Sequence, residues 1–238
     1  MRSEPQASQD PSPGSLSRAT LSRKGRGDTP GFFLLCSALV LALLVAPPPA
    51  LAKPLQIVAL GDSLTAGLGL PASESFPEVL QKALRAKGYD VEVFNAGVSG
   101  DTAADGLARF DWAVPDGVDA AIVELGANDM LRGLDPAAAE KTLGEILAKL
   151  QARHMATLLA GMRAAPNLGA DYQTRFDAIY PDLAKHYGVA LYPFFLDGIA
   201  ADPKLNQKDG LHPNKDGVDT IVAKIMPAVE ELIAKAKR

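Results

Sequence analysis

Five short apolar runs, separated by longer amphipathic stretches, set the strongest limit on how this chain folds. They are LQIVAL (55–60), VEVFNAG (91–97), AAIVEL (120–125), ATLLAGM (156–162) and VALYPF (189–194). Each run is apolar nearly throughout instead of alternating with polar residues. This pattern is typical of strands that are buried on both faces of a parallel sheet. The sequence therefore predicts a parallel sheet of five strands.

Helical patterns lie between and after these runs, near residues 74–87, 102–112, 136–153, 170–187 and 216–235. Asp135, followed by a proline, is typical of a helix start, and Gly88 and Gly188 are typical of helix ends. The last stretch carries an apolar stripe at helical spacing, from Val218 to Ile233. Strands that alternate with helices predict an α/β protein, a three-layer α/β/α sandwich around the five-stranded sheet.

The first 52 residues follow a different pattern. An uncharged apolar run, Phe32 to Ala46, is 15 residues long, which is shorter than the ~20 residues of a membrane-spanning helix. Basic residues precede it and the small-residue sequence ending at Ala52 follows it, as in a secretory signal peptide. We expect a leader at 1–52, one domain at 53–238, and a periplasmic or secreted protein with no stable membrane anchor. A retained anchor is the alternative interpretation.

Composition narrows the class of protein further. The only cysteine is Cys36, so a chain cleaved after Ala52 has no disulfide and depends on its hydrophobic core. Residues 53–238 carry 19 basic and 25 acidic side chains, a net charge of −6. They contain no basic cluster interleaved with aromatic residues, which argues against a nucleic-acid partner.

Polar residues and glycines gather where the predicted strands end. Gly-Asp-Ser-Leu (61–64) follows the first run, NAGVSGDT (95–102) the second and GAND (126–129) the third, and DGLHPN (209–214) lies beyond the fifth. In parallel α/β sheets, ligands bind beyond the carboxyl ends of the strands. We therefore expect these four segments to share one site.

A serine nucleophile needs a base to take its proton and a third group to orient that base. His154 and His186 fall at helix ends and are interpreted as surface residues, whereas His212 lies at the polar sheet edge, three residues after Asp209. An Asp-x-x-His spacing lets the carboxylate reach the imidazole Nδ1 atom and fix its tautomer. Ser63 is the serine at this edge.

The developing oxyanion of acyl transfer also needs hydrogen-bond donors. Candidates are the side-chain amide of Asn128 and the backbone N–H groups of Gly100 and Ser63. Each has a structural alternative: Asn128 as a cap or turn residue, Gly100 as a turn glycine and Ser63 as a helix cap. Asp62 and Asp129 are interpreted as supports of their turns.

The four segments occur in the order that characterises a known family. GDSLTAG (61–67), the glycine of SGDT, GAND and DGLH resemble the motifs of the SGNH (GDSL) hydrolases. The segment from AIYPDLAKHYGVALYPFFLDG (178–198) to DGLHPN resembles the bacterial multifunctional thioesterase, arylesterase and lysophospholipase branch. The resemblance spans residues 55–235 and implies a flavodoxin-like SGNH hydrolase fold.

The resemblance also implies roles for particular residues. Ser63 would be the nucleophile, His212 the general base and Asp209 the acid that orients it. The N–H groups of Ser63 and Gly100 and the side chain of Asn128 would form the oxyanion hole. The sequence departs from the family at one point, because Ala127 stands where members often have a second glycine.

Several motifs of other enzyme classes are missing from the sequence. There is no G-x-S-x-G nucleophile elbow, no H-E-x-x-H or Cys/His cluster for a metal, and no glycine-rich dinucleotide or phosphate fingerprint. We therefore expect catalysis without a cofactor or a metal ion.

Loops beyond the strand ends should select the substrate. Met130, Leu131 and Arg132, which follow Asn128, and Met162 are predicted to contact it. These loops are mostly small or apolar, which favours small acyl esters or thioesters, lysophospholipids among them. Two alternatives stay open: an acetylesterase acting on acetylated carbohydrate, and a non-catalytic ligand-binding domain with a relic site. Trp112, at a helix end, is predicted to pack against its neighbours.

Overall fold

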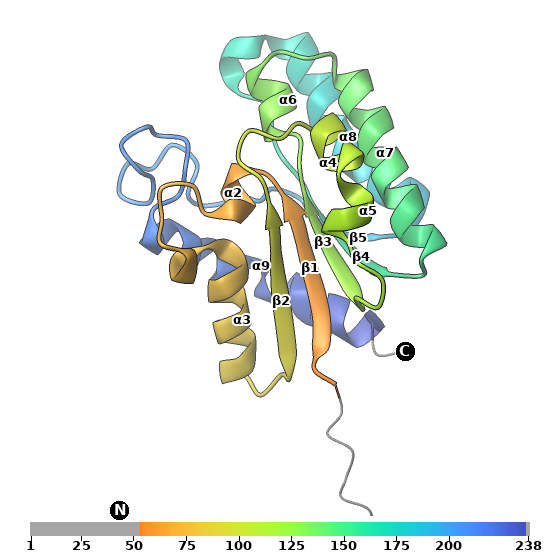
Figure 1. Ribbon diagram of the computed structural model, residues 1–238. Coiled ribbons are helices and arrows are strands. Elements are labelled where there is room, and N and C mark those ends of the chain that lie inside the picture. Colours follow the sequence, from red (N-terminus) through yellow and green to blue (C-terminus); the bar gives the residue numbers. More distant parts are fainter. Residues whose placement is uncertain (1–52, 237–238) are drawn as a thin grey trace, which may run out of the picture. The chain divides into compact units, whose positions relative to one another are not determined.

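A parallel sheet of five strands organises the computed structural model, which describes residues 53–236 (Figure 1). The strands are β1 (Leu55–Gly61), β2 (Val91–Gly97), β3 (Ala120–Glu124), β4 (Ala156–Ala160) and β5 (Ala190–Tyr192), in the order β2-β1-β3-β4-β5. Every neighbouring pair is parallel, so the predicted sheet is confirmed. The predicted leader, its cleavage point after Ala52 and Cys36 lie outside the described residues.

Helices cover both faces of this sheet. They are α2 (Ser63–Ala66), α3 (Phe76–Ala86), α4 (Ala103–Ala108), α5 (Phe110–Ala113), α6 (Ala127–Leu131), α7 (Pro136–Ala152), α8 (Ala170–Tyr187) and α9 (Lys215–Ala236), with short 3₁₀ turns η1 (Ala72–Glu74) and η2 (Pro166–Leu168). Helices α3 and α9 contact each other on one face, while α4, α7 and α8 form the layer on the other (Figure 1). The predicted three-layer sandwich is therefore confirmed. Within residues 53–236, no helix is both long and apolar enough to cross a bilayer.

The central position of β1 brings the polar strand ends together. Its last residue, Gly61, pairs with Gly97 of β2 on one side and Glu124 of β3 on the other. Apolar side chains of β1 such as Ile57 and Leu60 are completely buried, which fixes the strand in the core. The segments that follow β1, β2 and β3 therefore leave the sheet at one edge.

The structure differs from the sequence-based prediction in three places. The stretch 102–112 forms two helices, α4 and α5, which meet at Arg109. The segment after β3 forms α6, because Gly126 adopts a left-handed conformation (φ 111°) that turns the chain into a helix. The prediction that Trp112 packs was wrong, since its residue is 72% exposed. Phe110 and Ala113 of the same short helix face the core, which turns Trp112 outward.

The close contact between β2 and α2 leaves no room for a side chain at Gly97. A Cβ atom at this position would lie 2.3 Å from the backbone nitrogen of Ala66 and 2.9 Å from the Asp62 carbonyl oxygen. We expect Gly97→Ala to lower the free energy of unfolding by about 1–3 kcal/mol, the usual cost of overpacking, and to displace α2. Urea unfolding and the specific activity of the folded protein check this.

Gly117→Ala is the control, because its Cβ would meet no atom within 4 Å although its φ is 84°. Gly117→Ala should lower the free energy of unfolding, because alanine disfavours the left-handed conformation, and it should keep full specific activity. Equal activity loss in both variants would contradict the prediction.

Candidate active site

Ser63 is the first residue of α2, directly after β1, but it does not cap the helix. The cap is Asp62, whose Oδ1 atom accepts a hydrogen bond from the backbone N–H of Leu64 at 3.0 Å. The Ser63 hydroxyl is therefore available, and its Oγ atom lies 3.0 Å from Nε2 of His212. This distance suits transfer of the hydroxyl proton to the imidazole.

His212 lies in the loop before α9 and is paired with Asp209. Its Nδ1 atom is 2.7 Å from Oδ2 of Asp209, while Oδ1 accepts the backbone N–H groups of Leu211 and His212 at 2.9 and 3.0 Å. The backbone hydrogen bond from His212, together with that from Leu211, lowers the pKa of Asp209 from 3.8 to about 2. An ionised Asp209 favours the tautomer with the proton on Nδ1, which leaves Nε2 free to accept from Ser63.

Amide side chains that sequence reasoning did not single out hold this loop in place. The Nε2 group of Gln207 donates to the carbonyls of Leu68 and Pro213 at 2.7 and 2.9 Å, and its backbone N–H donates to the His212 carbonyl at 2.8 Å. Because Leu68 closely follows α2, Gln207 ties the serine segment to the histidine loop. The signal in the sequence is Gln207 itself, an amide residue next to the DGLHPN motif.

The three candidate oxyanion donors differ in their present hydrogen bonds. Among residues 53–236, the backbone N–H groups of Ser63 and Gly100 donate no hydrogen bond. Gly100 has a φ of 91°, a left-handed conformation that favours glycine, and no atom lies within 4 Å of the position of a Cβ. Asn128 lies inside α6 and is not its cap; its amide donates to Oδ2 of Asp62 at 3.1 Å and to the Asp101 carbonyl at 3.0 Å.

Two buried carboxyl groups lie close to Ser63: Asp62 precedes it in the chain, and Glu124 ends the neighbouring strand β3. Asp62 and Glu124 are 0% and 1% exposed, and Oε2 of Glu124 accepts a hydrogen bond from the Thr65 hydroxyl at 2.7 Å. Burial raises the pKa of Asp62 from 3.8 to about 6. Burial, and then the nearby Asp62 carboxylate, raise the pKa of Glu124 well above 4.5. Asp129 acts as predicted for a support, since its Oδ2 accepts the N–H of Ala103 at 2.8 Å.

The raised pKa of Asp62 predicts a pH dependence of stability. Its folded-state pKa of about 6 lies above the unfolded value of 3.8, so its stabilising contribution is complete below 3.8 and is lost as the pH rises through 6. The shift of about two units corresponds to roughly 3 kcal/mol. We expect the difference in unfolding free energy between wild type and Asp62→Asn to change by this order between pH 4 and pH 7, measured by urea unfolding.

The comparison uses the change with pH and not the absolute stability, because the substitution also alters the hydrogen bonds to Leu64 and Asn128. Burial raises the pKa of Asp129 as well, so the difference between wild type and Asp129→Asn should change with pH in the same direction and gives a second case of the same effect. A difference between wild type and Asp62→Asn that stays constant from pH 4 to pH 7 would contradict the assigned pKa.

An apolar cavity of about 410 Å³ opens beside Ser63, Asn128 and His212. Three of the four predicted substrate contacts, Met130, Leu131 and Met162, line it. Arg132 does not line it; its guanidinium instead donates to the Gly100 carbonyl at 2.6 Å. The lining also includes Leu64 and residues of the loops that follow β4 and β5, namely Arg163, Ala164, Ala165, Pro166, Phe194, Leu196, Ala200 and Ala201.

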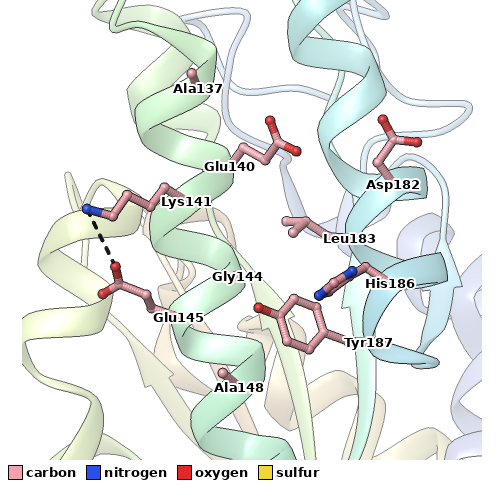
Figure 2. A pocket seen from close by; sticks show the side chains of 10 residues that line it. All are labelled: Ala137, Glu140, Lys141, Gly144, Glu145, Ala148, Asp182, Leu183, His186 and Tyr187. Atoms are coloured by element: carbon pink, nitrogen blue, oxygen red, sulfur yellow. Dashed lines mark ion pairs between the residues drawn. The ribbon is translucent and has the colours of Figure 1, made fainter.

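A larger hollow of about 610 Å³ lies elsewhere, between α7 and α8, and Figure 2 shows the side chains that line it. His186 lies there, but the lining contains no serine, threonine or cysteine for it to activate. The hollow is bordered by small residues and surface charges, including the pair Lys141 and Glu145 at 3.9 Å (Figure 2). The smaller cavity at Ser63 is therefore the candidate site. In the part of the chain that the structure describes, no three His, Cys, Asp or Glu side chains are grouped to hold a metal ion.

Comparison with known proteins identifies the family of this chain. Residues 59–219 match the GDSL-like Lipase/Acylhydrolase family. Esterase TesA of Pseudomonas aeruginosa is 38% identical over 194 residues, covering 81% of this chain and 96% of TesA. Thioesterase 1/protease 1/lysophospholipase L1 of Escherichia coli is 39% identical over 181 residues, covering 73% of this chain and 84% of that protein.

Solved structures point the same way. The crystal structure of AlinE4, an SGNH-hydrolase family esterase, is 50% identical, with a TM-score of 0.65, and the match covers 76% of this chain and 98% of AlinE4. The crystal structure of TesA gives a TM-score of 0.71 at 36% identity, covering 74% of this chain and 99% of TesA. The chain therefore belongs to the GDSL-like lipase/acylhydrolase family of enzymes, the SGNH hydrolases.

Proposed function

We propose that this protein is a serine esterase that hydrolyses carboxylic ester or thioester bonds of acyl substrates. The observation that carries the proposal is the hydrogen-bonded series Ser63–His212–Asp209, with distances of 3.0 and 2.7 Å, at the mouth of an apolar cavity. The relatives named esterase, arylesterase, thioesterase and lysophospholipase support the same substrate class.

The distances in this series support a two-step reaction. His212 Nε2 removes the proton of the Ser63 hydroxyl as Oγ attacks the carbonyl carbon of the substrate, and Asp209 stabilises the resulting imidazolium. The imidazolium then protonates the leaving alcohol or thiol, which leaves an acyl group on Ser63. A water molecule, deprotonated by His212, attacks the carbonyl carbon of this acyl-enzyme. The bond to Ser63 then breaks, the imidazolium returns the proton to the Ser63 Oγ atom, and the carboxylic acid is released.

The oxyanion of each tetrahedral intermediate would accept the N–H groups of Ser63, Gly100 and Asn128. Those of Ser63 and Gly100 are unoccupied among residues 53–236. Both amide hydrogens of Asn128 already have acceptors, the Asp62 carboxylate and the Asp101 carbonyl. In the proposed reaction, the oxyanion takes the place of one of these two acceptors. The Asn128 amide then donates to the negative charge that develops on the substrate carbonyl oxygen.

Export completes the proposal. Residues 1–52 would direct the chain across the membrane and be removed after Ala52, which leaves residues 53–238 as one periplasmic or secreted domain. The support is the short apolar run with its basic flank and small-residue exit. N-terminal sequencing of the protein secreted from the full-length gene tests it, and a mature protein that begins before the apolar run would contradict it.

An acyl-chain and head-group profile of the purified mature protein tests the proposed activity. The substrates are p-nitrophenyl esters from acetyl to dodecanoyl, an acyl thioester, a lysophospholipid and acetylated xylan. We expect turnover of acyl chains longer than acetyl, because the cavity wall is apolar. A strong preference for acetyl groups on xylan would favour an acetylesterase instead. Absence of turnover, together with absence of fluorophosphonate labelling at Ser63, would favour a binding protein.

A further inference from the structure

Arg163 is the one arginine or lysine among the residues that line the cavity at Ser63. Apart from His212 and the reacting groups, the rest of the lining is apolar or carries uncharged amide and backbone groups. Pockets of this kind orient ligands through a few polar groups set in an apolar wall. A permanent charge in such a wall is therefore a candidate determinant of specificity.

Within residues 53–236, the guanidinium group of Arg163 forms no hydrogen bond and no ion pair. Its charge acts on Asp197 only at longer range, where it lowers the pKa of that carboxyl less than Lys224 does. The other two arginines near the site are occupied: Arg132 donates to the Gly100 carbonyl at 2.6 Å, and the buried Arg109 donates to Asp101 and to the Gly61 carbonyl. Arg163 is thus the one arginine or lysine in the described cavity lining, and its guanidinium is free to contact a ligand there.

The acidic groups nearby are already engaged elsewhere. Asp197 pairs with Lys224 at 2.8 Å, and Asp177 accepts the backbone N–H of Ala164 at 2.8 Å. The central carbon of the Arg163 guanidinium lies 5.3 Å from the ring centroid of Phe194, which also lines the cavity. This cation–π contact restrains the side chain while its N–H groups stay free to donate.

The strand order sets the distance between this charge and the nucleophile. Ser63 follows β1 and Arg163 follows β4, and β3 lies between these two strands. Neighbouring strands are about 4.8 Å apart, so the two strand ends are separated by roughly 10 Å. Met130 and Met162 line the cavity between them. A matching substrate has an ester at one end, an apolar spacer, and a charge at the other.

We propose that Arg163 binds an anionic group, a carboxylate or a phosphate, carried by the ester or thioester substrate. Arginine suits this role because its planar guanidinium donates two parallel hydrogen bonds to such groups. The inference rests on the proposed function, since it assigns a substrate feature to the same site. The anion belongs either to the far end of the acyl chain or to the leaving group.

Three chromogenic esters separate these sources. p-Nitrophenyl hexanoate is neutral, mono-p-nitrophenyl adipate carries a carboxylate on the acyl chain, and the hexanoyl ester of 5-hydroxy-2-nitrobenzoate carries it on the leaving group. We expect Arg163→Gln to lower kcat/KM for one charged ester by about fivefold to tenfold, the range for a partly exposed charge-assisted contact. Turnover of the neutral ester should stay within about twofold, and the loss should shrink at high salt.

Arg85→Gln is the matched control, because Arg85 belongs to α3 and does not line the cavity. It should leave all three rates unchanged. If Arg163→Gln lowers none of the rates, or lowers all three equally, the anion receptor is refuted while hydrolysis of the neutral ester still supports the proposed function.

If the wild-type protein hydrolyses none of the esters, the proposed function fails, and binding alone then tests Arg163. Calorimetric titration compares adipate with hexanoate on the wild type and on Arg163→Gln. Tighter binding of adipate that is lost in Arg163→Gln supports the receptor. Equal binding of the two acids, or a preference for adipate that survives the substitution, refutes it.

Discussion

Ser63→Ala is expected to lower kcat for an acyl ester by about 10⁴-fold or more, because Ser63 carries the only hydroxyl group among the described residues that line the cavity. The Oγ atom lies 3.0 Å from His212 Nε2 and is the partner that completes the series to Asp209. The Asp62 cap and the apolar packing of β1 do not involve this hydroxyl. The variant should therefore fold normally and still bind substrate.

Rates with p-nitrophenyl hexanoate, together with circular dichroism and urea unfolding, check this prediction. Ser73→Ala serves as the control, because Ser73 is an exposed serine in η1 and its substitution should leave the rate unchanged. A folded Ser63→Ala protein that keeps more than a hundredth of the wild-type rate would refute the assignment of Ser63 as nucleophile.

Asn128→Ala is expected to lower kcat by about 10²–10³-fold, the usual cost of removing one oxyanion donor. The contribution is made in the transition state, where the carbonyl oxygen carries charge, so KM should change little. The substitution also removes the amide that donates to Oδ2 of Asp62. We therefore expect a modest loss of stability in addition to the loss of rate.

Steady-state kinetics that separate kcat from KM test this, with urea unfolding to measure the structural effect. Gln151→Ala, an exposed amide on α7, is the control and should alter neither value. An effect of Asn128→Ala that falls on KM alone would show that the amide binds the ground state and is not an oxyanion donor.

Much of the architecture follows from residue patterns. The five apolar runs became the five strands, because strands buried on both faces need apolar side chains on both. The proposed site residues were found from their positions just beyond strands. Ser63, the loop of Gly100, and Asn128 follow β1, β2 and β3, and adjacent parallel strands end at one edge. Grouping these residues requires only that β1, β2 and β3 are neighbours, and it does not depend on where β4 and β5 lie.

Features that depend on tertiary contacts were harder to predict from the sequence. The break between α4 and α5 falls at Arg109, whose buried side chain contacts Asp101 nearby in the chain and the Gly61 carbonyl 48 residues earlier. From the sequence, Arg132 is predicted to contact the substrate and Arg163 is not named. The structure separates them, because Arg132 reaches across to the carbonyl of Gly100 whereas Arg163 lines the cavity. Contacts between residues far apart in the chain leave no periodic signal.

The hydrogen bond between Ser63 and His212 joins residues 149 positions apart. During synthesis on the ribosome, the serine emerges near the beginning of the domain, and the imidazole emerges after all five strands. A nascent chain that stops before residue 209 lacks both the proposed base and its proposed orienting acid. Under the proposed mechanism, ester hydrolysis requires a chain that extends at least through residue 212, and we expect shorter translation products to be inactive.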